Sequence, residues 1–434
     1  MTFELLKKEV IDAGLCTHCG TCVGICPSNA LKIIDEFGLC IPQLNGKCTG
    51  CGLCYEVCPG GIVPFYELNK KLFGRTPSSP LGNYEHIYIG YAMDKQVRKR
   101  GASGGIVTAL LLNLFRKGLI RGAVVVTSCE DKPWQMKAYV ACSEEEILKA
   151  AQSKYTLVPV NVVLRDIMKM EGKFAFVGLP CQVHALRKLE ACNHSIMKKI
   201  KYIIGIYCGN NLQFNATLSL LRKLGVKDLD EIRSLEYRAG DWPGEFRVTL
   251  KNGTTYSVKK FYYNYLIPFY IERRCLFCID LSNELADVSV GDCWMPELER
   301  RGGEGWSVII SRTEKGSKII RDALADGAIF LKRIDEANAL RMHSHGLDFK
   351  KVGAFARMKI RKMMRRKIPY YGVNSPKISR KRFLVEIWKL LTFKICSYNF
   401  VRKVVESYIP LFLLGRIFVT ARIVWRKATQ KRWN

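Results

Sequence analysis

CTHCGTCVGICP at residues 16–27 and CTGCGLCYEVCP at residues 48–59 repeat one cysteine spacing near the start of this 434-residue chain. Each copy has the form C-x2-C-x2-C-x3-C-P. Two such copies are typical of a bacterial-type ferredoxin domain that binds two [4Fe–4S] clusters. The sequence therefore predicts a two-cluster ferredoxin-like domain over residues 1–70.

The fourth cysteine of each copy is expected to serve the cluster of the other copy, because the proline turn directs it away from its own triple. We assign one cluster to Cys16, Cys19, Cys22 and Cys58, and the other to Cys48, Cys51, Cys54 and Cys26. A zinc site or disulfides are the alternative interpretation. Zinc spacings pair two ligands at a time and rarely contain such a triple before Cys-Pro.

The composition of the chain favours metal binding over disulfides. There are 18 cysteines, but the chain is large and opens with Met1-Thr2-Phe3-Glu4 rather than with an apolar signal region. This usage predicts metal sites in a reducing cytoplasm. The uncharged run at residues 101–115 falls short of the roughly 18 apolar residues of a spanning helix, so we expect no transmembrane segment.

The region after the ferredoxin motif has the pattern of an α/β domain. Residues 71–83, which contain Thr76-Pro77-Ser78-Ser79-Pro80, are predicted to be a linker. Over residues 84–347, strands are predicted at 123–127, 174–177 and 202–206, and helices at 105–117 and 183–189. This alternation favours a mixed-sheet α/β domain. An Asn-Gly turn within residues 246–258 predicts a β-hairpin.

Two further cysteines follow predicted strands, and two more form a CxxC pair. Cys181 lies in GLPCQ, Cys208 lies in IYCG, and Cys275 and Cys278 form CLFC. Cysteines at the carboxyl ends of neighbouring strands can converge on one ligand, and a third [4Fe–4S] cluster is the preferred interpretation. Packed thiols or half of a zinc site remain the alternatives. The other cysteines are expected to be packed thiols: Cys40, Cys129, Cys142, Cys192, Cys293 and Cys396.

A candidate phosphate-binding loop precedes the helix predicted at residues 105–117. Ser103, Gly104 and Gly105 would present backbone N–H groups to an anion, and Arg98, Lys99 and Arg100 lie just ahead. An ordinary N-cap followed by a tight turn explains the same residues.

At GLPCQ, IYCG, CLFCIDLSNELADVSVGD and RAGDWPG, the sequence resembles the coenzyme F420 hydrogenase/dehydrogenase beta subunit family over about residues 85–345. The resemblance implies an FAD site and a core cluster bound by Cys181, Cys208, Cys275 and Cys278. It implies FAD contacts at Ser103, Gly104, Gly105, Thr108, Lys154 and Tyr155. The turn RAGDWPG, with Arg238, Gly240, Trp242, Pro243 and Gly244, would be a lid beside the flavin or a plain loop anchored by its tryptophan.

These features predict an iron–sulfur flavoprotein oxidoreductase. FAD accepts a hydride and releases single electrons, and therefore connects a hydride carrier such as reduced coenzyme F420 with iron–sulfur clusters and a redox partner protein or ferredoxin. The alternatives are a ferredoxin-dependent reductase of another organic substrate and a non-catalytic electron-transfer subunit. His184 and Asp292 are weaker candidates for moving protons.

Residues 348–434 form a basic C-terminal region. From Lys351 onward there are 22 Lys and Arg against Glu386 and Glu406, which accounts for +20 of the net charge of +30. Apolar residues at helical spacing form a stripe of Val401, Val404, Val405, Tyr408, Ile409, Leu414, Ile417, Phe418, Ala421 and Trp425. We expect amphipathic helices that dock on an anionic membrane surface, at its inner face, or on an acidic partner; packing on the chain's own body is the alternative. No recognition fold supports specific nucleic-acid binding.

Overall fold

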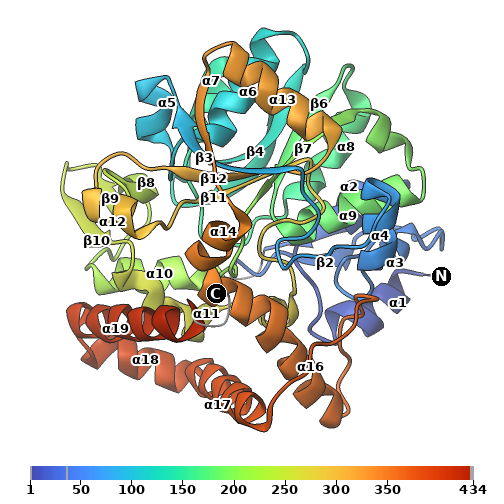
Figure 1. Cartoon of the computed structure of the whole chain (residues 1–434). Helices are drawn as coiled ribbons and strands as arrows, with labels where there is room; N and C mark the ends of the chain where they lie inside the picture. The colour runs from blue at the N-terminus through green and yellow to red at the C-terminus, as the bar shows by residue number, and fades with distance from the viewer. Residues whose placement is uncertain (1, 36–37, 431–434) are drawn as a thin grey trace.

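An eight-stranded mixed sheet lies at the centre of the computed structural model, which describes residues 2–35 and 38–430 (Figure 1). The strand order is β13 (Ile329–Arg333), β3 (His86–Ala92), β12 (Ser307–Ser311), β11 (Val288–Asp292), β7 (Ile200–Ile206), β6 (Phe174–Gly178), β4 (Gly122–Ser128) and β5 (Met136–Ala141). Strands β11, β7, β6 and β4 pair in parallel, and the remaining pairs are antiparallel. The mixed α/β class expected from the sequence is confirmed.

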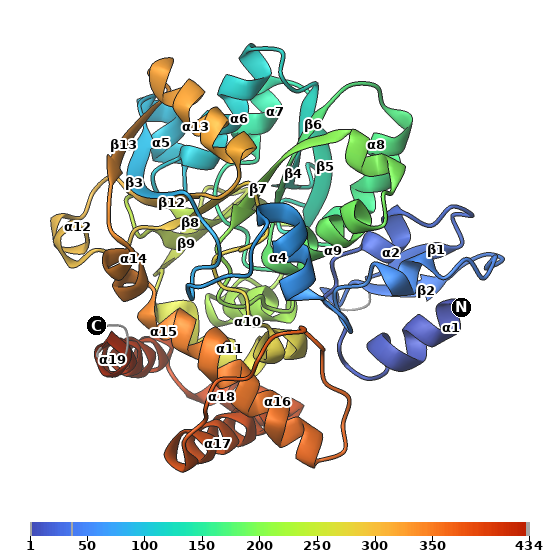
Figure 2. The same ribbon diagram turned by 45° about the vertical axis from the view of Figure 1, so that its right-hand side comes forward.

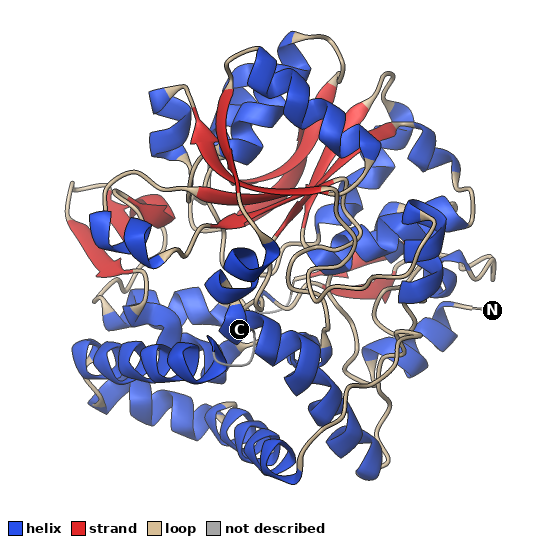
Figure 3. Ribbon diagram, in the orientation of Figure 1, coloured by secondary structure: helices blue, strands red, loops and turns tan. Residues whose placement is uncertain are grey.

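Both faces of this sheet are buried, because successive side chains of a strand point to opposite faces. Val124, Phe174 and Phe176 belong to one apolar core, whereas Val125 and Ala175 belong to another on the opposite face. Helices lie on both faces (Figure 3). The first core is covered by α8 (Leu164–Lys169), α9 (Pro180–Ala191) and α10 (Asn215–Lys223), and the second by α6 (Ile106–Arg116), α7 (Glu144–Lys149) and α13 (Glu314–Ala325).

A separate three-stranded antiparallel sheet is appended to the body. It consists of β8 (Ile232–Ala239), β9 (Glu245–Leu250) and β10 (Thr255–Lys259). The turn between β9 and β10 contains Asn252 and Gly253, and Gly253 has a φ of +88°. This left-handed conformation suits glycine, so the hairpin predicted from the Asn-Gly pair is confirmed.

The N-terminal ferredoxin-like domain, which we call the ferredoxin module, contains an internal repeat. Its elements are α1 (Phe3–Leu6), η1 (Lys7–Ile11), α2 (Thr21–Gly24), β1 (Leu31–Ile34), β2 (Ile41–Leu44), α3 (Leu53–Glu56) and α4 (Phe65–Phe73). Gly20 and Gly52 hold equivalent places in the two cysteine motifs, and both adopt left-handed backbone conformations before α2 and α3. His18 and Gly50 form a second equivalent left-handed pair. In Figure 2 the module packs beside α9, on the flank of the body.

The rest of the chain is mostly helical. Around the body lie α5 (Lys95–Arg100), η3 (Val160–Val163), η4 (Ser195–Lys198), η5 (Tyr262–Tyr265), α11 (Leu266–Tyr270), η6 (Arg273–Phe277), α12 (Pro296–Arg301), α14 (Glu336–Met342) and α15 (Ser344–Leu347). The C-terminal layer consists of η7 (Asp348–Gly353), α16 (Ala354–Met363), α17 (Arg380–Cys396), α18 (Asn399–Tyr408) and α19 (Leu411–Gln430). Figures 1 and 2 both show α17, α18 and α19 below the body, away from the central sheet.

No single helix among the described residues has the length and apolar character needed to cross a membrane. By length and composition, α18 and the part of α19 up to Thr429 meet the test only as a pair, and they are bent by 112° where they join.

Candidate redox centres

The two N-terminal cysteine motifs fold so that the fourth cysteine of each lies beside the other motif's first three cysteines. Burial, and then the thiols of Cys58 and Cys19, raise the pKa of the Cys16 thiol well above its usual range. Burial, followed by Cys51, Cys26 and Cys48, raises the pKa of Cys54 to about 11. The structure therefore brings Cys58 to the first triple and Cys26 to the second, in the arrangement that the spacing predicts.

These two cysteine sets differ in their access to solvent. Cys19 is buried, whereas Cys48 and Cys51 are exposed. The set of Cys16, Cys19, Cys22 and Cys58 adjoins the body of the protein through Cys19, a neighbour of Cys181. The set of Cys26, Cys48, Cys51 and Cys54 combines these two exposed cysteines with the buried Cys54. We call these the inner set and the outer set.

The four cysteines from the α/β domain converge beside the inner set. Cys181 lies in the first turn of α9 after β6, Cys208 follows β7, and Cys275 and Cys278 belong to η6 and the residue after it. Burial raises the pKa of Cys181 well above its usual range, and its neighbours Cys19, Cys208, Cys275 and Cys278 raise it further. We call Cys181, Cys208, Cys275 and Cys278 the core set.

Crowded, partly buried thiols are a donor set that suits the cationic iron atoms of a cluster. Each thiol must lose its proton to bind iron, and crowding of like charges opposes this until a metal compensates. Among the described residues, no three His, Cys, Asp or Glu side chains lie close enough together to hold a single metal ion. Four thiolates are the usual ligands of a [4Fe–4S] cluster, so the four cysteines of the core set fit such a cluster by their composition.

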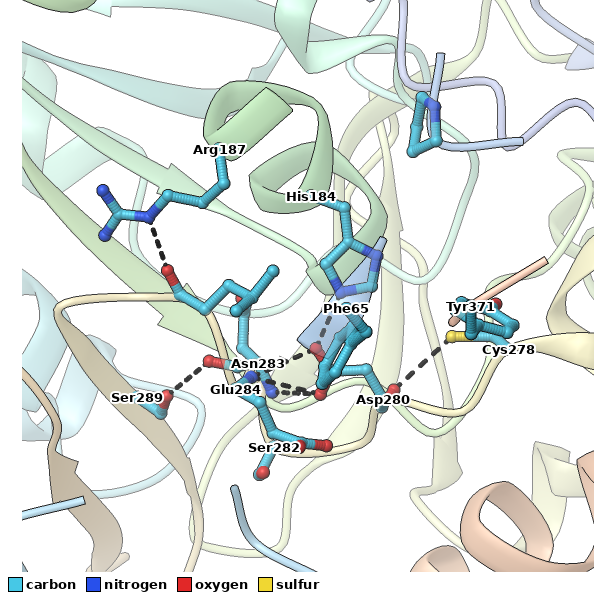
Figure 4. Close-up of polar contacts among 12 residues, drawn as sticks. Phe65, His184, Arg187, Cys278, Asp280, Ser282, Asn283, Glu284, Ser289 and Tyr371 are labelled. Carbon is cyan, nitrogen blue, oxygen red and sulfur yellow. Dashed lines mark hydrogen bonds and ion pairs between the residues drawn. The ribbon is translucent and has the colours of Figure 1, made fainter. Parts of the chain in front are cut away.

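The loop that carries Cys278, which we call the core loop, is held by a hydrogen-bond network (Figure 4). The carboxylate of Asp280 accepts from the backbone N–H groups of Asn283 and Glu284 and lies 2.9 Å from His184 Nε2. The Cys278 thiol lies 3.5 Å from the carbonyl oxygen of Asp280. Burial alone would raise the pKa of Asp280, but its contact with His184 lowers it. His184 therefore supports the core loop.

Two buried cations lie against the core set. Burial would lower the pKa of Lys350, yet Cys278, Cys275 and Cys208 raise it above its ordinary value. Arg274 interacts with Cys278 and Cys181 in the same way. The exposed fractions of these two residues are only 1% and 3%. The sequence pattern did not predict that either residue would lie beside the core set, because only the fold brings them there.

Specific polar contacts fix the ferredoxin module against the core set. Lys188 Nζ donates to the Cys58 carbonyl at 2.8 Å, and Arg274 donates to the carbonyls of Pro59 and Gly60. Asn161 donates from its backbone N–H to the Cys19 carbonyl and from its side chain to Thr21. These bonds join segments that flank the inner and core sets.

The loop formed by Ser103, Gly104 and Gly105, which we call the flavin loop, lies at the carboxyl end of β3. The N–H of Ala92, the last residue of β3, donates to the Gly104 carbonyl, and the Gly104 N–H donates to Ser307 Oγ at 3.0 Å. A Cβ at Gly104 would come within 2.5 Å of the Gly90 carbonyl oxygen. Gly105 is the N-cap of α6, and no side chain caps this helix. Ser103 bonds to Ser307 instead of capping, which leaves the first turn of α6 without a side-chain acceptor.

Arg238 joins this loop to Tyr155 and Asp292. Its guanidinium donates to the Ala102 carbonyl, to the Tyr155 hydroxyl at 3.0 Å and to the Asp292 carboxylate at 3.0 and 3.2 Å. Trp242 Nε1 donates to the same carboxylate at 3.2 Å. The turn RAGDWPG is thus both anchored by a buried tryptophan and joined to the predicted flavin residues. Burial would raise the pKa of Asp292, but Arg238 lowers it, so this carboxylate stays charged.

Cations outnumber acids around Tyr155. Burial lowers the pKa of Lys260, whose Nζ lies 4.3 Å from the Tyr155 ring centroid. Lys154 Nζ donates instead to the carbonyls of Ala150, Ala151 and Gln152, and burial lowers its pKa to about 7. Burial would raise the pKa of Tyr155, yet Arg238 and Lys260 outweigh it and lower the pKa. The hydroxyl of the adjacent Thr156 is buried without a hydrogen-bond partner. These features fit an anionic group such as the pyrophosphate of FAD.

Other candidates from the sequence have more ordinary places. Thr108 is buried in the first turn of α6, and Arg98 forms an ion pair with Glu304 at 2.7 Å. The thiol of Cys293 is buried and lies 3.5 Å from Met342 Sδ, not in the core set. A hollow of about 910 Å³, lined by lysines that include Lys117, Lys173 and Lys201, lies at the amino end of β6 and β7, away from all of these groups.

Comparison with known families identifies three matching regions. Residues 8–59 match the model of a 4Fe-4S dicluster domain. Residues 87–165 match the N-terminal model, and residues 171–337 the C-terminal model, of the coenzyme F420 hydrogenase/dehydrogenase beta subunit. Together these matches cover most of the chain.

Curated and solved relatives agree with these matches. The coenzyme F420 hydrogenase subunit beta of Methanosarcina barkeri is 30% identical over 262 residues, which cover 59% of this chain and 84% of that protein. The coenzyme F420-dependent sulfite reductase of Methanocaldococcus jannaschii is 30% identical over 360 residues, which cover 78% of this chain; the chain spans about half (51%) of that relative's length. A chain in the solved F420-reducing [NiFe] hydrogenase complex from Methanosarcina barkeri has a TM-score of 0.55 and 25% identity, with 68% of this chain and 98% of that chain covered.

Proposed function

Because the chain belongs to the coenzyme F420 hydrogenase/dehydrogenase beta subunit family and carries a 4Fe-4S dicluster domain, we propose that it is an iron–sulfur flavoprotein oxidoreductase. It passes electrons between a hydride carrier, with reduced coenzyme F420 as the best match, and a redox partner protein. The observation that carries this proposal is the core set, whose Cys181 adjoins Cys19 of the inner set.

One short segment links the proposed centres. Tyr155 accepts a hydrogen bond from Arg238 at the flavin loop, and the Val158 carbonyl lies 3.3 Å from the side-chain amide of Gln182, next to Cys181. Asn161 then donates to Cys19 of the inner set. The flavin loop, the core set and the inner set are therefore held in a fixed order, which supports one continuous path for electrons.

FAD bound at the flavin loop would supply the exchange between a hydride and single electrons. The backbone N–H groups at the start of α6 would receive its pyrophosphate, and Arg238 and Lys260 would neutralise its charge. We propose Ser103, Gly104, Gly105, Thr108, Lys154 and Tyr155 as its contacts. The thiolates of the core, inner and outer sets would each hold one [4Fe–4S] cluster, and the exposed outer set would face the partner.

Anaerobically prepared protein tests this function. We expect about one FAD per chain, and stopped-flow mixing with reduced coenzyme F420 should bleach it, whereas NADH should not, because the sequence has no G-x-G-x-x-G fingerprint after a strand. Lys260→Met should weaken FAD retention, and Lys259→Met, at an exposed neighbouring position on β10, is the matched control.

Each other outcome has a defined meaning. Reduction by NADH but not by coenzyme F420 would reject the proposed donor. Reduction by neither donor, with FAD present, would favour a ferredoxin-dependent reductase of another organic substrate. Iron and sulfide without FAD would favour a non-catalytic electron-transfer subunit.

A further inference from the structure

Helix α17 carries a continuous apolar stripe on its outer side. Leu384, Trp388, Leu391 and Ile395 follow one another at helical spacing, and between 54% and 67% of each residue is exposed. Side chains four or three residues apart lie on one helix face. A stripe of this length in contact with water is unusual for a surface helix, because such stripes normally pack on a core.

The apolar exposure continues onto α18 and α19. The exposed residues there include Phe400, Tyr408, Phe412, Leu413, Ile417 and Val424. The stripe expected from the sequence behaves differently, because Val401, Val405 and Phe418 pack partly against the core and Leu414 is buried. The expected stripe is thus divided, because most of it attaches the helices to the body, whereas Tyr408 and Ile417 belong to the exposed apolar face.

The outward face is also cationic. Seven exposed lysines and arginines lie on or beside these helices, namely Lys377, Arg380, Lys381, Lys394, Lys403, Arg416 and Lys427. The two acidic residues of this region form ion pairs with cations other than these seven. Glu386 is buried among Arg357, Arg382 and Lys389, and Glu406 pairs with Arg222 of α10. No carboxylate of residues 351–430 is therefore left to offset the exposed cations.

We propose that the outward faces of α17, α18 and α19 form a docking surface for an anionic membrane. Aromatic and aliphatic side chains flanked by lysine and arginine are the combination that holds a helix in the interface plane of a lipid bilayer. Each basic residue near an anionic surface adds about 1 kcal/mol of attraction in general. Neither α18 nor α19 is long and apolar enough to cross a membrane by itself, and the two are bent by 112° where they join.

Ion pairs hold α17 and α19 to the body of the protein. The Arg382 guanidinium binds the Asp348 carboxylate at 2.7 and 2.8 Å, and Arg426 of α19 binds Glu299 at 2.6 and 2.8 Å. The helices are thus bound to the body by their inner sides, and the proposal goes beyond the redox function because it needs none of the cysteine sets.

Vesicle sedimentation of the full-length holoprotein tests the proposal. We expect binding to vesicles that contain phosphatidylglycerol, weak binding to pure phosphatidylcholine, and loss of binding at high salt. Replacing Leu384, Trp388, Leu391 and Ile395 together by serine should weaken binding at least about tenfold. The matched control is Leu324→Ser with Met168→Ser, which changes exposed apolar residues of α13 and α8.

A second variant protects the test against misfolding. Lys381→Glu with Lys394→Glu changes only exposed positions, and it should reduce binding to the anionic vesicles while iron content and reductase activity stay unchanged. Absence of binding by the wild type, equal binding to both kinds of vesicle, or equal binding by the wild type and both surface variants would overturn the proposal.

Discussion

The core set and the outer set are chemically similar cysteine groups in opposite surroundings. The core cysteines are partly buried, lie beside the buried Lys350 and Arg274, and are supported by the pair of His184 and Asp280. The outer set includes two exposed cysteines, Cys48 and Cys51. The difference indicates that one end of the proposed path is insulated and electropositive, whereas the other is accessible to a partner.

Removal of a core ligand should have the largest effect. Cys181→Ser should abolish electron transfer from the hydride donor to an external acceptor, a loss beyond the roughly 10–100-fold typical of an outer-shell change. Cys192→Ser, an exposed cysteine at the end of the same helix, is the matched control. Full activity in Cys181→Ser would show that the core set is not on the path.

The C-terminal layer should stabilise the core loop but not the outer set. Arg357 donates to the Leu276 carbonyl within CLFC and is ion-paired with Glu386. Breaking such a buried pair costs about 3–5 kcal/mol, so Glu386→Gln should lower the free energy of unfolding by that order at pH 7. The core cluster should then be lost before the N-terminal clusters, as visible absorbance during thermal unfolding would report.

The same pair predicts a pH dependence. Burial would raise the pKa of Glu386, but Arg357, Lys389 and Arg382 lower it below 4.5. The stabilisation is therefore complete above the ordinary pKa and is lost as the pH falls through the lowered value. The difference in unfolding free energy between the wild type and Glu386→Gln should stay constant from pH 7 to about pH 5 and shrink as the pH falls below the ordinary pKa. A difference that grows on acidification would contradict this assignment.

The contact between Asp280 and His184 should matter less for retention of the core cluster than the cysteine ligands do. Asp280→Asn keeps the size of the side chain but removes the charge that faces His184, and it should weaken retention of the core cluster about 10–100-fold. Iron release to a chelator measures this retention. Asp241→Asn, in the RAGDWPG turn, is a control carboxylate away from the core set. Equal release from both variants would mean that the loop is held by its backbone alone.

The smallest expected effect is on the reduction potential. Lys350 places a buried positive charge beside Cys278, Cys275 and Cys208, and a positive charge favours the reduced, more negative cluster. Lys350→Met should lower the reduction potential of the core cluster by on the order of 60 mV, which corresponds to a tenfold change in the equilibrium constant of a one-electron reduction. The reduction potential of the outer cluster should stay unchanged. An EPR-monitored redox titration separates the two. An unchanged reduction potential of the core cluster would show that the charge of Lys350 does not distinguish the core set from the outer set.

The sequence predicted best what is local in the chain. Both ferredoxin motifs and the Asn-Gly hairpin depend on residues within a few positions of one another. Lys350, Arg274 and the link from Arg238 to Asp292 were not predicted, because the fold alone brings these distant charges together. Periodicity found the C-terminal helices but could not choose between two apolar faces, since both carry apolar residues. Lys431 and Arg432, part of the basic charge, lie outside the described residues.

Iron and zinc analysis of the anaerobically prepared protein, with Cys181→Ser in parallel, tests the central claim most directly. Three four-iron clusters predict about twelve iron atoms per chain in the wild type, about eight in Cys181→Ser, and little zinc in either. About eight iron atoms in both proteins, or zinc in place of the missing iron, would contradict a core cluster held by Cys181, Cys208, Cys275 and Cys278.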